Sequence, residues 1–175
     1  MKNVTASAAF SIALLACTNG EQADASSDDI QKLADISPVD REPFKKTTIA
    51  KFDEPWAMTF LPDNRMLVTT KPGKLWLVDQ KGAKTSISGV PEVDYGGQGG
   101  FGDVVLAPDF AESGTIYLSW VEAGDGNTRG AVVGSANLAL PAIGSKAEAI
   151  TLTNLKVIWT QTPKVKGKGH YSHRM

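Results

Sequence analysis

The hydrophobic pattern from residue 47 onward consists of short β-type runs separated by turn residues. Three runs, at 57–61, 66–69 and 74–78, are dominated by β-branched, aromatic and long apolar residues and show no helical periodicity. The sequences between them, Pro62-Asp63-Asn64 and Pro72-Gly73, are typical of turns. We therefore expect three consecutive strands joined by tight connections.

The same pattern returns later in the chain. Phe60-Leu61-Pro62-Asp63 corresponds to Leu106-Ala107-Pro108-Asp109, and the strand at 66–69 corresponds to Ile116-Tyr117-Leu118-Ser119. Pro62 and Pro108 are 46 residues apart, and four-stranded propeller blades recur at about 40 to 50 residues. The repeat predicts an all-β fold of the β-propeller class, with a chance pair of hairpins in a β-sandwich as the alternative.

Two further stretches, 127–134 and 149–159, also have the composition of strands. Within the second stretch, 151–153 and 157–159 are apolar enough to be inner strands. A propeller blade buries its faces against its neighbours, and about two and a half blades would leave large apolar faces uncovered. We therefore expect a truncated or partial propeller that contains only about the first two to three blades.

The first 17 residues have the pattern of an export signal. Lys2 precedes a nine-residue apolar run, Ala8 to Ala16, which has the length of a signal-peptide core and is far below the roughly 20 residues of a membrane span. The run ends in Leu14-Leu15-Ala16-Cys17, which resembles a bacterial lipoprotein signal with Cys17 as the lipidated residue. We predict an exported protein, periplasmic or lipid-anchored; the alternative is a plain secretory signal with an incidental cysteine.

Composition adds the domain limits and excludes some classes of function. Residues 18–46 are polar and Ala-rich and predict a flexible tether, so residues 47–175 form the predicted propeller domain. The formal net charge of −1 gives no electrostatic signal for nucleic acid or for an anionic membrane surface, so membrane contact is expected only through the lipid anchor. The single cysteine excludes an intramolecular disulfide and a Cys-rich zinc site.

The most unusual stretch is Tyr95-Gly96-Gly97-Gln98-Gly99-Gly100-Phe101-Gly102-Asp103, with five glycines in nine residues. Glycines remove side chains where a backbone must bend sharply or approach another group closely. The glutamine amide among them can both donate and accept hydrogen bonds. A flexible loop is the plain alternative, and a nucleotide cradle is disfavoured because no helical pattern follows.

A second stretch, 164–174, holds both histidines of the chain, His170 and His173, among lysines and glycines. Their spacing could indicate a metal site, but no third histidine and no nearby carboxylate accompany them. The lysines could form a phosphate or nucleic-acid patch, although the run is short. A histidine on a glycine-flanked loop also suits a general base, because its ordinary pKa is near neutrality.

Three motifs together resemble one family. Pro55-Trp56-Ala57-Met58 with 60–63, the Gly-Gln-Gly-Gly segment at 97–100, and Gly169-His170-Tyr171-Ser172-His173-Arg174 occur in the order and spacing of the glucose/sorbosone dehydrogenases. These are the soluble aldose sugar dehydrogenases that depend on pyrroloquinoline quinone (PQQ). The resemblance covers about residues 51–174, which is essentially all of the predicted folded part.

The resemblance implies a six-bladed propeller that carries PQQ over its central opening, near a calcium ion. It implies oxidation of an aldose at its anomeric carbon to the lactone, with hydride transfer to the quinone and then to an external electron acceptor. In the family the general base stands four residues before an arginine, which matches His170 and Arg174. By the same resemblance Gln98 contacts the cofactor or substrate, Arg174 supports, and His173 is structural.

The family's ligands for calcium and for the PQQ carboxylates come from later blades, so no metal ligand is assigned in this chain. The alternative is an exported propeller without redox chemistry, either a lactonase-like hydrolase or a module that binds a ligand or a protein. The Gly-Gln-Gly-Gly segment and the His170 motif favour the dehydrogenase. A lactonase would be expected to show metal-ligating carboxylates.

Overall fold

A computed structural model describes residues 43–145, 149–169, 171 and 173–175 of the chain. The chain divides into two units, residues 1–46 and residues 47–175, and the second contains every strand described below. Cys17, most of the predicted tether and His170 lie outside the described residues. In the part of the chain that the structure describes, no helix is long and apolar enough to cross a membrane.

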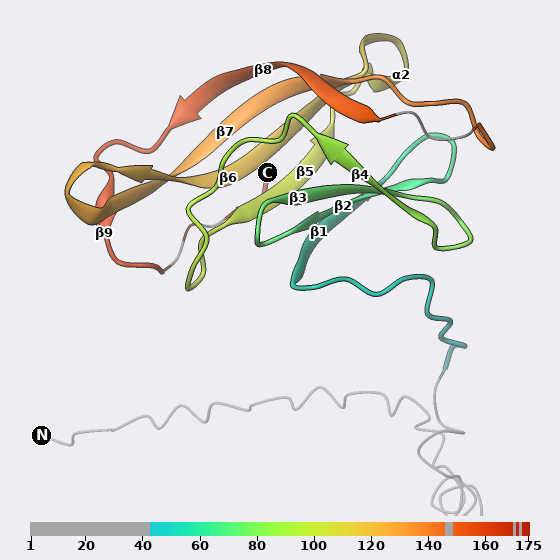
Figure 1. Ribbon diagram of the computed structural model, residues 1–175, viewed down its shortest axis with the longest axis horizontal. Helices are drawn as coiled ribbons and strands as arrows, with labels where there is room; N and C mark the ends of the chain where they lie inside the picture. Colours follow the sequence, from blue (N-terminus) through green and yellow to red (C-terminus); the bar gives the residue numbers. More distant parts are fainter. Residues whose placement is uncertain (1–42, 146–148, 170, 172) are drawn as a thin grey trace, which may run out of the picture. The chain divides into compact units, whose positions relative to one another are not determined.

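The first part of the domain is a four-stranded antiparallel sheet (Figure 1). Its strands are β1 (Pro55–Phe60), β2 (Met66–Thr70), β3 (Lys74–Val78) and β4 (Lys84–Ser88). The strands predicted at 57–61, 66–69 and 74–78 are confirmed. Strand β4 was not predicted, because Ile87 is its sole apolar residue.

The second part is a sheet of longer strands. It consists of β5 (Phe101–Leu106), β6 (Thr115–Gly124), β7 (Thr128–Leu138) and β8 (Ile150–Thr160), with the short β9 (Val165–Lys166) paired to β7. The four-residue helix α2 (Phe110–Ser113) connects β5 to β6, and the 3-10 turn η1 (Asp125–Asn127) connects β6 to β7. The strand predictions for 127–134 and 149–159 are confirmed, with shifted bounds.

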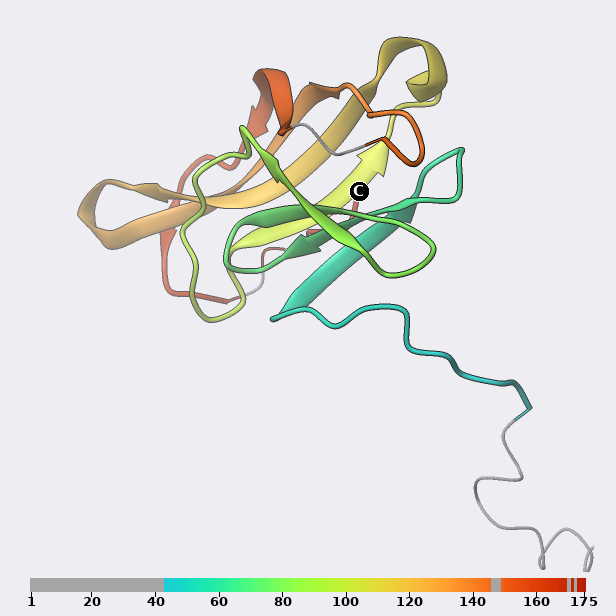
Figure 2. The same cartoon turned by 45° about the vertical axis from the view of Figure 1, so that its right-hand side comes forward.

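The two sheets are joined through their fourth strands. Strand β4 pairs in parallel with the start of β8, where Ile87 faces Ile150 and Ser88 faces Thr151. The strand order is therefore β1-β2-β3-β4-β8-β7-β6-β5, and Figure 2 shows the two sheets folded toward each other across this junction.

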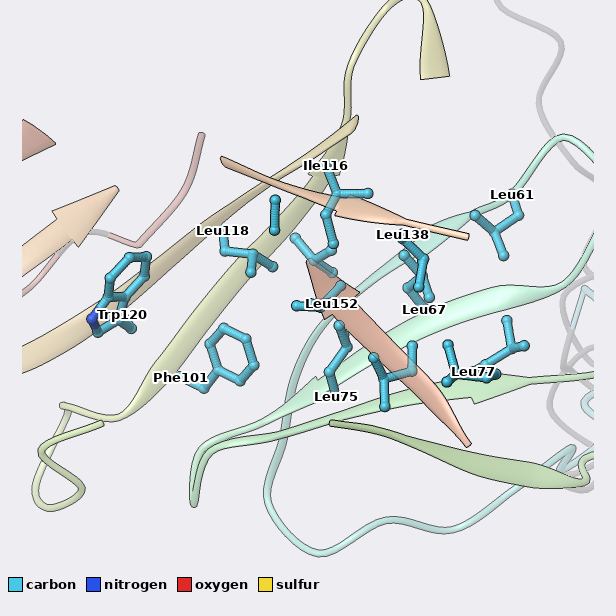
Figure 3. Packing of buried hydrophobic residues seen from close by; sticks show 14 of the residues in the cluster. Leu61, Leu67, Leu75, Leu77, Phe101, Ile116, Leu118, Trp120, Leu138 and Leu152 are labelled. Atoms are coloured by element: carbon cyan, nitrogen blue, oxygen red, sulfur yellow. The ribbon is translucent and has the colours of Figure 1, made fainter. Parts of the chain in front are cut away.

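One apolar core lies between the sheets (Figure 3). Leu67 and Leu75 of the first sheet meet Ile116 and Leu118 of the second, and Phe101 of β5 lies among them; all five are fully buried. Apolar area removed from water stabilises by about 25 cal/mol per Å². This interface is therefore the main reason that the two sheets form a single unit.

The predicted repeat is confirmed at the level of single hydrogen bonds. Strands β1 and β5 begin 46 residues apart and contain six residues each. Both have a register shift after their first residue, between Pro55 and Met58 and between Phe101 and Val104. A chance pair of hairpins in a β-sandwich would not explain why both hairpins have the same register shift 46 residues apart.

In each sheet, a hydroxyl group on the second strand accepts a hydrogen bond from a backbone N–H of the first strand at the register shift. Ala57 N donates to Thr69 Oγ1 at 3.1 Å, and Asp103 N donates to Ser119 Oγ at 2.8 Å. Ala57 and Asp103 are also 46 residues apart. The two hydroxyls then donate onward, Thr69 to Gly102 O at 2.7 Å and Ser119 to His173 O at 2.9 Å.

One strand prediction is wrong in detail. The run 157–159 lies on β8 but is not covered like an inner strand, because β8 pairs with β4 only at Ile150 and Thr151 and with β7 alone at 157–159. Its side chains are about half exposed among the described residues: Val157, Ile158 and Trp159. Apolar character alone indicates a strand, whereas its place in the sheet depends on which neighbours pack against it.

Candidate active site

The glycine-rich segment is a tight turn followed by a strand. Gly99 N donates to Gly96 O at 2.9 Å, and Gly97 has φ = 56°, a conformation that favours glycine. The turn presents Gln98 at an exposed tip. The segment therefore forms a hydrogen-bonded turn, and its last residues, from Phe101 on, form the start of β5.

The carboxyl-terminal segment packs directly on this turn. Gln98 N donates to Lys168 O at 2.7 Å. A Cβ atom on Gly97 would lie 2.5 Å from that same oxygen, and one on Gly99 would lie 3.2 Å from the Tyr171 ring. The glycines are thus required by the close approach of the two segments, which the structure brings together from 70 residues apart in sequence.

Several hydrogen bonds hold the backbone on both sides of His170. Before it, Gly167 O accepts from Arg129 Nη1 at 2.8 Å and from the Tyr171 hydroxyl at 3.2 Å. After it, His173 O accepts from Ser119 Oγ at 2.9 Å. His170 itself lies outside the described residues, so its role stays a prediction, but its described neighbours are fixed next to the Gln98 turn.

His173 occupies a buried position between the first strands of the two sheets. Its ring lies where a Gly102 side chain would be, since a Cβ there would come 2.2 Å from Nδ1. The Trp56 ring meets it edge-on at a centroid distance of 5.5 Å. Burial lowers the pKa of His173, and the nearby Asp103 carboxylate opposes this only in part, so the imidazole is neutral at pH 7.

The Nε2 atom of His173 is buried and has no hydrogen-bond partner among the described residues. No group of three or more His, Cys, Asp or Glu side chains in the described ranges could hold a metal ion. The His173 ring packs against Gly102, Trp56 and Tyr171, while the roles expected for His173 and for His170 stay predictions.

Polar contacts brace the outer side of the Gln98 turn. Lys71 Nζ donates to Gly97 O at 2.6 Å and lies 5.5 Å from the centre of the Tyr95 ring. The Tyr95 hydroxyl donates to Glu54 Oε2 at 2.7 Å, and this hydrogen bond raises the pKa of Tyr95. Because the Lys168 ammonium also lies against Gly96, two cationic groups lie on the backbone of this turn, an arrangement that suits an anionic ligand.

Four residues that build this site were not predicted from the sequence: Lys71, Asp94, Ser119 and Arg129. Ser119 could have been found from the repeat, because it corresponds to Thr69. Arg129 Nε donates to Asp94 Oδ2 at 2.7 Å. No local sequence pattern predicts this ion pair, because the two residues are 35 apart in sequence.

Comparison with known proteins gives the same family as the motifs. The sequence profile of the family described as "Glucose / Sorbosone dehydrogenase" matches residues 52–175. Aldose sugar dehydrogenase YliI of Escherichia coli (strain K12) is 41% identical over 128 residues, which are 71% of this chain and 32% of that protein.

Comparison with solved structures gives the same family. A crystal structure of a glucose dehydrogenase is 40% identical with a TM-score of 0.63, covering 70% of this chain and 34% of that one. The PQQ-bound form of an aldose sugar dehydrogenase from Streptomyces coelicolor, at 24% identity, 66% and 33% coverage and a TM-score of 0.50, supports the fold alone. The chain spans about a third of the length of these relatives. Its two sheets are blades of a β-propeller, and the chain belongs to the glucose/sorbosone dehydrogenase family.

Proposed function

We propose that this protein takes part in the PQQ-dependent oxidation of an aldose sugar at its anomeric carbon, with the lactone as product. The observation that carries the proposal is the packing of the two site segments, in which Gln98 N bonds to Lys168 O at 2.7 Å and the Gly97 position leaves no room for a side chain. This contact holds the Gln98 backbone N–H on Lys168 O, and Lys168 stands two residues before His170 in the sequence. The relatives named above are aldose and glucose dehydrogenases.

The roles of the residues follow from their chemistry. Conversion of the cyclic aldose to its lactone removes a hydride from the anomeric carbon and a proton from the hydroxyl group on that carbon. His170 accepts this proton through its neutral imidazole. Gln98, exposed at the tip of its turn, donates or accepts a hydrogen bond that orients the sugar or the quinone edge.

The described residues fit one edge of the cofactor. PQQ carries carboxylates and a quinone, and the ammonium groups of Lys71 and Lys168 lie at Gly97 and Gly96 of the turn that presents Gln98. When bound, PQQ supplies the acceptor for the hydride and passes the electrons to an external acceptor. Among the described residues, no cluster of three acidic, His or Cys side chains is available to hold calcium.

We do not expect this chain to be active alone, because it spans about a third of the length of its relatives. The test is therefore dye-linked oxidation of aldoses, after addition of PQQ and calcium, by the protein extended with the later blades that its relatives contain. We expect activity that requires PQQ, and a loss of at least about 100-fold in kcat for His170→Ala, since general-base catalysis contributes roughly 10²- to 10⁴-fold. Lys164→Met is the matched control, because it removes another lysine of the same segment, whose ammonium group pairs with Glu122 of β6. Activity that survives in His170→Ala would contradict the assignment of the base, and no oxidation by the extended protein would contradict the function.

We further propose that the protein is exported and anchored through a lipid on Cys17. The support is the apolar run that ends at the single cysteine of the chain. Metabolic labelling with a radioactive fatty acid should label the wild-type chain and not Cys17→Ser. Equal labelling of both, or of neither, would contradict the anchor.

A further inference from the structure

The peptide group between Gly97 and Gln98 is held on both of its polar sides. Its carbonyl, Gly97 O, accepts a hydrogen bond from Lys71 Nζ at 2.6 Å, and its amide, Gln98 N, donates to Lys168 O at 2.7 Å. In a planar trans peptide the C=O and the N–H point in opposite directions. Lys71 and Lys168 therefore grip this one peptide plane from opposite sides.

Lys71 also holds the far end of the glycine-rich segment. Its backbone O accepts from Phe101 N at 3.0 Å, and a Cβ atom on Gly100 would lie 2.3 Å from that oxygen. Lys71 directly follows β2, and its own N donates to Glu54 O at 2.9 Å. One residue of the first sheet thus contacts the segment on both sides of Gln98.

The ammonium contact matters because the turn has little conformational restriction of its own. Gly96 and Gly97 have φ = 151° and 56°, and glycine populates positive and negative φ about equally. Rotation of the peptide plane would break the bond to Lys168 O and change the direction of the Gln98 side chain. The Lys71 ammonium opposes this rotation, and a cation on the carbonyl also strengthens the N–H of the same peptide as a donor.

A neighbouring aromatic ring guides the ammonium group to this carbonyl. Lys71 Nζ lies 5.5 Å from the centre of the Tyr95 ring, within the range of a cation–π contact. The Tyr95 hydroxyl donates to Glu54 Oε2 at 2.7 Å, and Glu54 has φ = 44°, which is uncommon outside glycine. The ring that guides Lys71 is thus fixed to the residue that precedes β1.

We propose that Lys71 is a positioning residue that fixes the Gly97–Gln98 peptide and, through it, the direction of the Gln98 side chain. The catalytic meaning of this inference rests on the proposed function, in which Gln98 orients the sugar or the quinone edge. The backbone contacts of Lys71 do not depend on its side chain. Substitution of the side chain therefore tests the ammonium contact alone.

Amide exchange in the full chain provides a readout that does not depend on activity. The chain is labelled with ¹⁵N-glutamine, and the Gln98 signals are identified by their loss in Gln98→Ala. Lys71→Met should accelerate exchange of the Gln98 amide about 3- to 10-fold, the range expected for loss of an exposed hydrogen bond from a charged group. The Gln161 amide, which donates to Ala131 O at 2.8 Å in the second sheet, should keep its rate.

Two further lysine variants separate the cation from the side chain that carries it. Lys71→Arg keeps a cationic donor for Gly97 O and should keep most of the protection. Lys74→Met is the matched control, because it removes the nearby lysine whose ammonium lies 5.9 Å from the Trp76 ring. If Lys71→Met does not fold, Lys71→Gln serves in its place, since its side chain is shorter and uncharged.

The kinetic readout is kcat against KM in the protein extended with the later blades. In Lys71→Met the kcat for aldose oxidation should fall about 10-fold with little change in KM, because misplacement of an orienting group slows the reaction. Lys71→Arg should restore most of kcat, and Lys74→Met should keep it.

Three results would overturn the inference. One is a Gln98 amide that exchanges in Lys71→Met as it does in wild type. Another is an equal acceleration at Gln98 and Gln161, which would indicate a general loosening of the domain. The third is equally fast exchange in Lys71→Arg and Lys71→Met, since the cationic donor would then not hold the carbonyl. If the extended wild-type protein oxidises no aldose, the proposed function fails, and amide exchange still decides whether Lys71 positions Gln98.

Discussion

Strands β1 and β5 occupy equivalent places in the two blades, yet their surroundings differ. Both have the same register shift and the same hydroxyl-capped amide. On β5, Phe101 and Val104 are fully buried, whereas Met58 and Phe60 of β1 are 52% and 62% exposed. The difference arises because β5 lies between the first blade and the carboxyl-terminal segment, while among the described residues β1 is covered on one side. Local pattern thus determines the strand, and neighbours determine its burial.

The two strands also differ at the position that meets His173. Gly102 of β5 corresponds to Trp56 of β1, 46 residues earlier. The His173 ring lies in the space of the absent Gly102 side chain and against the edge of Trp56. The two strands therefore carry the smallest and the largest residue, Gly102 and Trp56, at the position where His173 of the carboxyl-terminal segment packs between the blades.

Gly102→Ala should have the largest effect on stability. The added Cβ would lie 2.2 Å from His173 Nδ1, so β5 or the site segment must move. Overpacking of this kind costs about 1 to 3 kcal/mol or more, and we expect the upper end in the free energy of unfolding measured with urea. The matched change on β1, Trp56→Phe, should cost less; a larger loss for Trp56→Phe would contradict the packing described here.

A second comparison uses the equivalent apolar positions Val104 and Met58. Val104→Ala empties buried space and should lower the free energy of unfolding by about 1 to 3 kcal/mol. Met58→Ala should stay within about 0.5 kcal/mol of wild type, because the Met58 side chain is half exposed. Equal losses in urea unfolding would show that β1 is buried in solution to the same extent as β5.

The two hydroxyl groups allow a finer test. Ser119→Ala and Thr69→Val each remove one acceptor for a strand amide and one donor to the next segment. Each should cost about 1 to 3 kcal/mol, because buried partners are left unpaired. Hydrogen exchange should accelerate at the Asp103 amide in Ser119→Ala and at the Ala57 amide in Thr69→Val; the reverse pattern would refute the assignment.

The smallest expected effect is a pH dependence from His173. Burial lowers its pKa from the ordinary value of 6.5, so the unfolded chain binds the proton more readily. The folded state therefore keeps its full stability above pH 6.5, where the His173 imidazole is neutral in both states, and loses stability relative to the unfolded chain as the pH falls below that value. The fall in melting temperature between pH 7.5 and 5.5 should therefore be smaller in His173→Gln than in wild type. An equal or larger fall would contradict a neutral, buried imidazole.

Much of the fold could be predicted from the sequence, because the blade pattern is local and repeats. The exceptions have physical reasons. Strand β4 carries one apolar residue, Ile87, and is held mainly by backbone pairing to β3. The start of β5 contains Gly102 and looked like a loop, since glycine weakens a strand signal. The exposed run at 157–159 looked like an inner strand because its residues are apolar.

The site was predictable in part. The two segments that carry Gln98 and His170 stood out by composition, since glycine and histidine are concentrated there. The contact between these two segments could not be predicted from composition, because it depends on Arg129, Asp94 and Ser119, which come from other strands and loops. Such residues are typical of surface or turn positions when seen alone, and their role arises only once the blades are folded.

The most direct test of one shared site is a double-mutant cycle between Gln98→Ala and His170→Ala in PQQ-dependent aldose oxidation. Groups that act as a unit are strongly non-additive. We expect each single variant to lose kcat, and the double variant to lose little more than His170→Ala alone. Losses that multiply, so that the double variant equals the product of the two singles, would contradict a single site built from the Gln98 turn and the His170 segment.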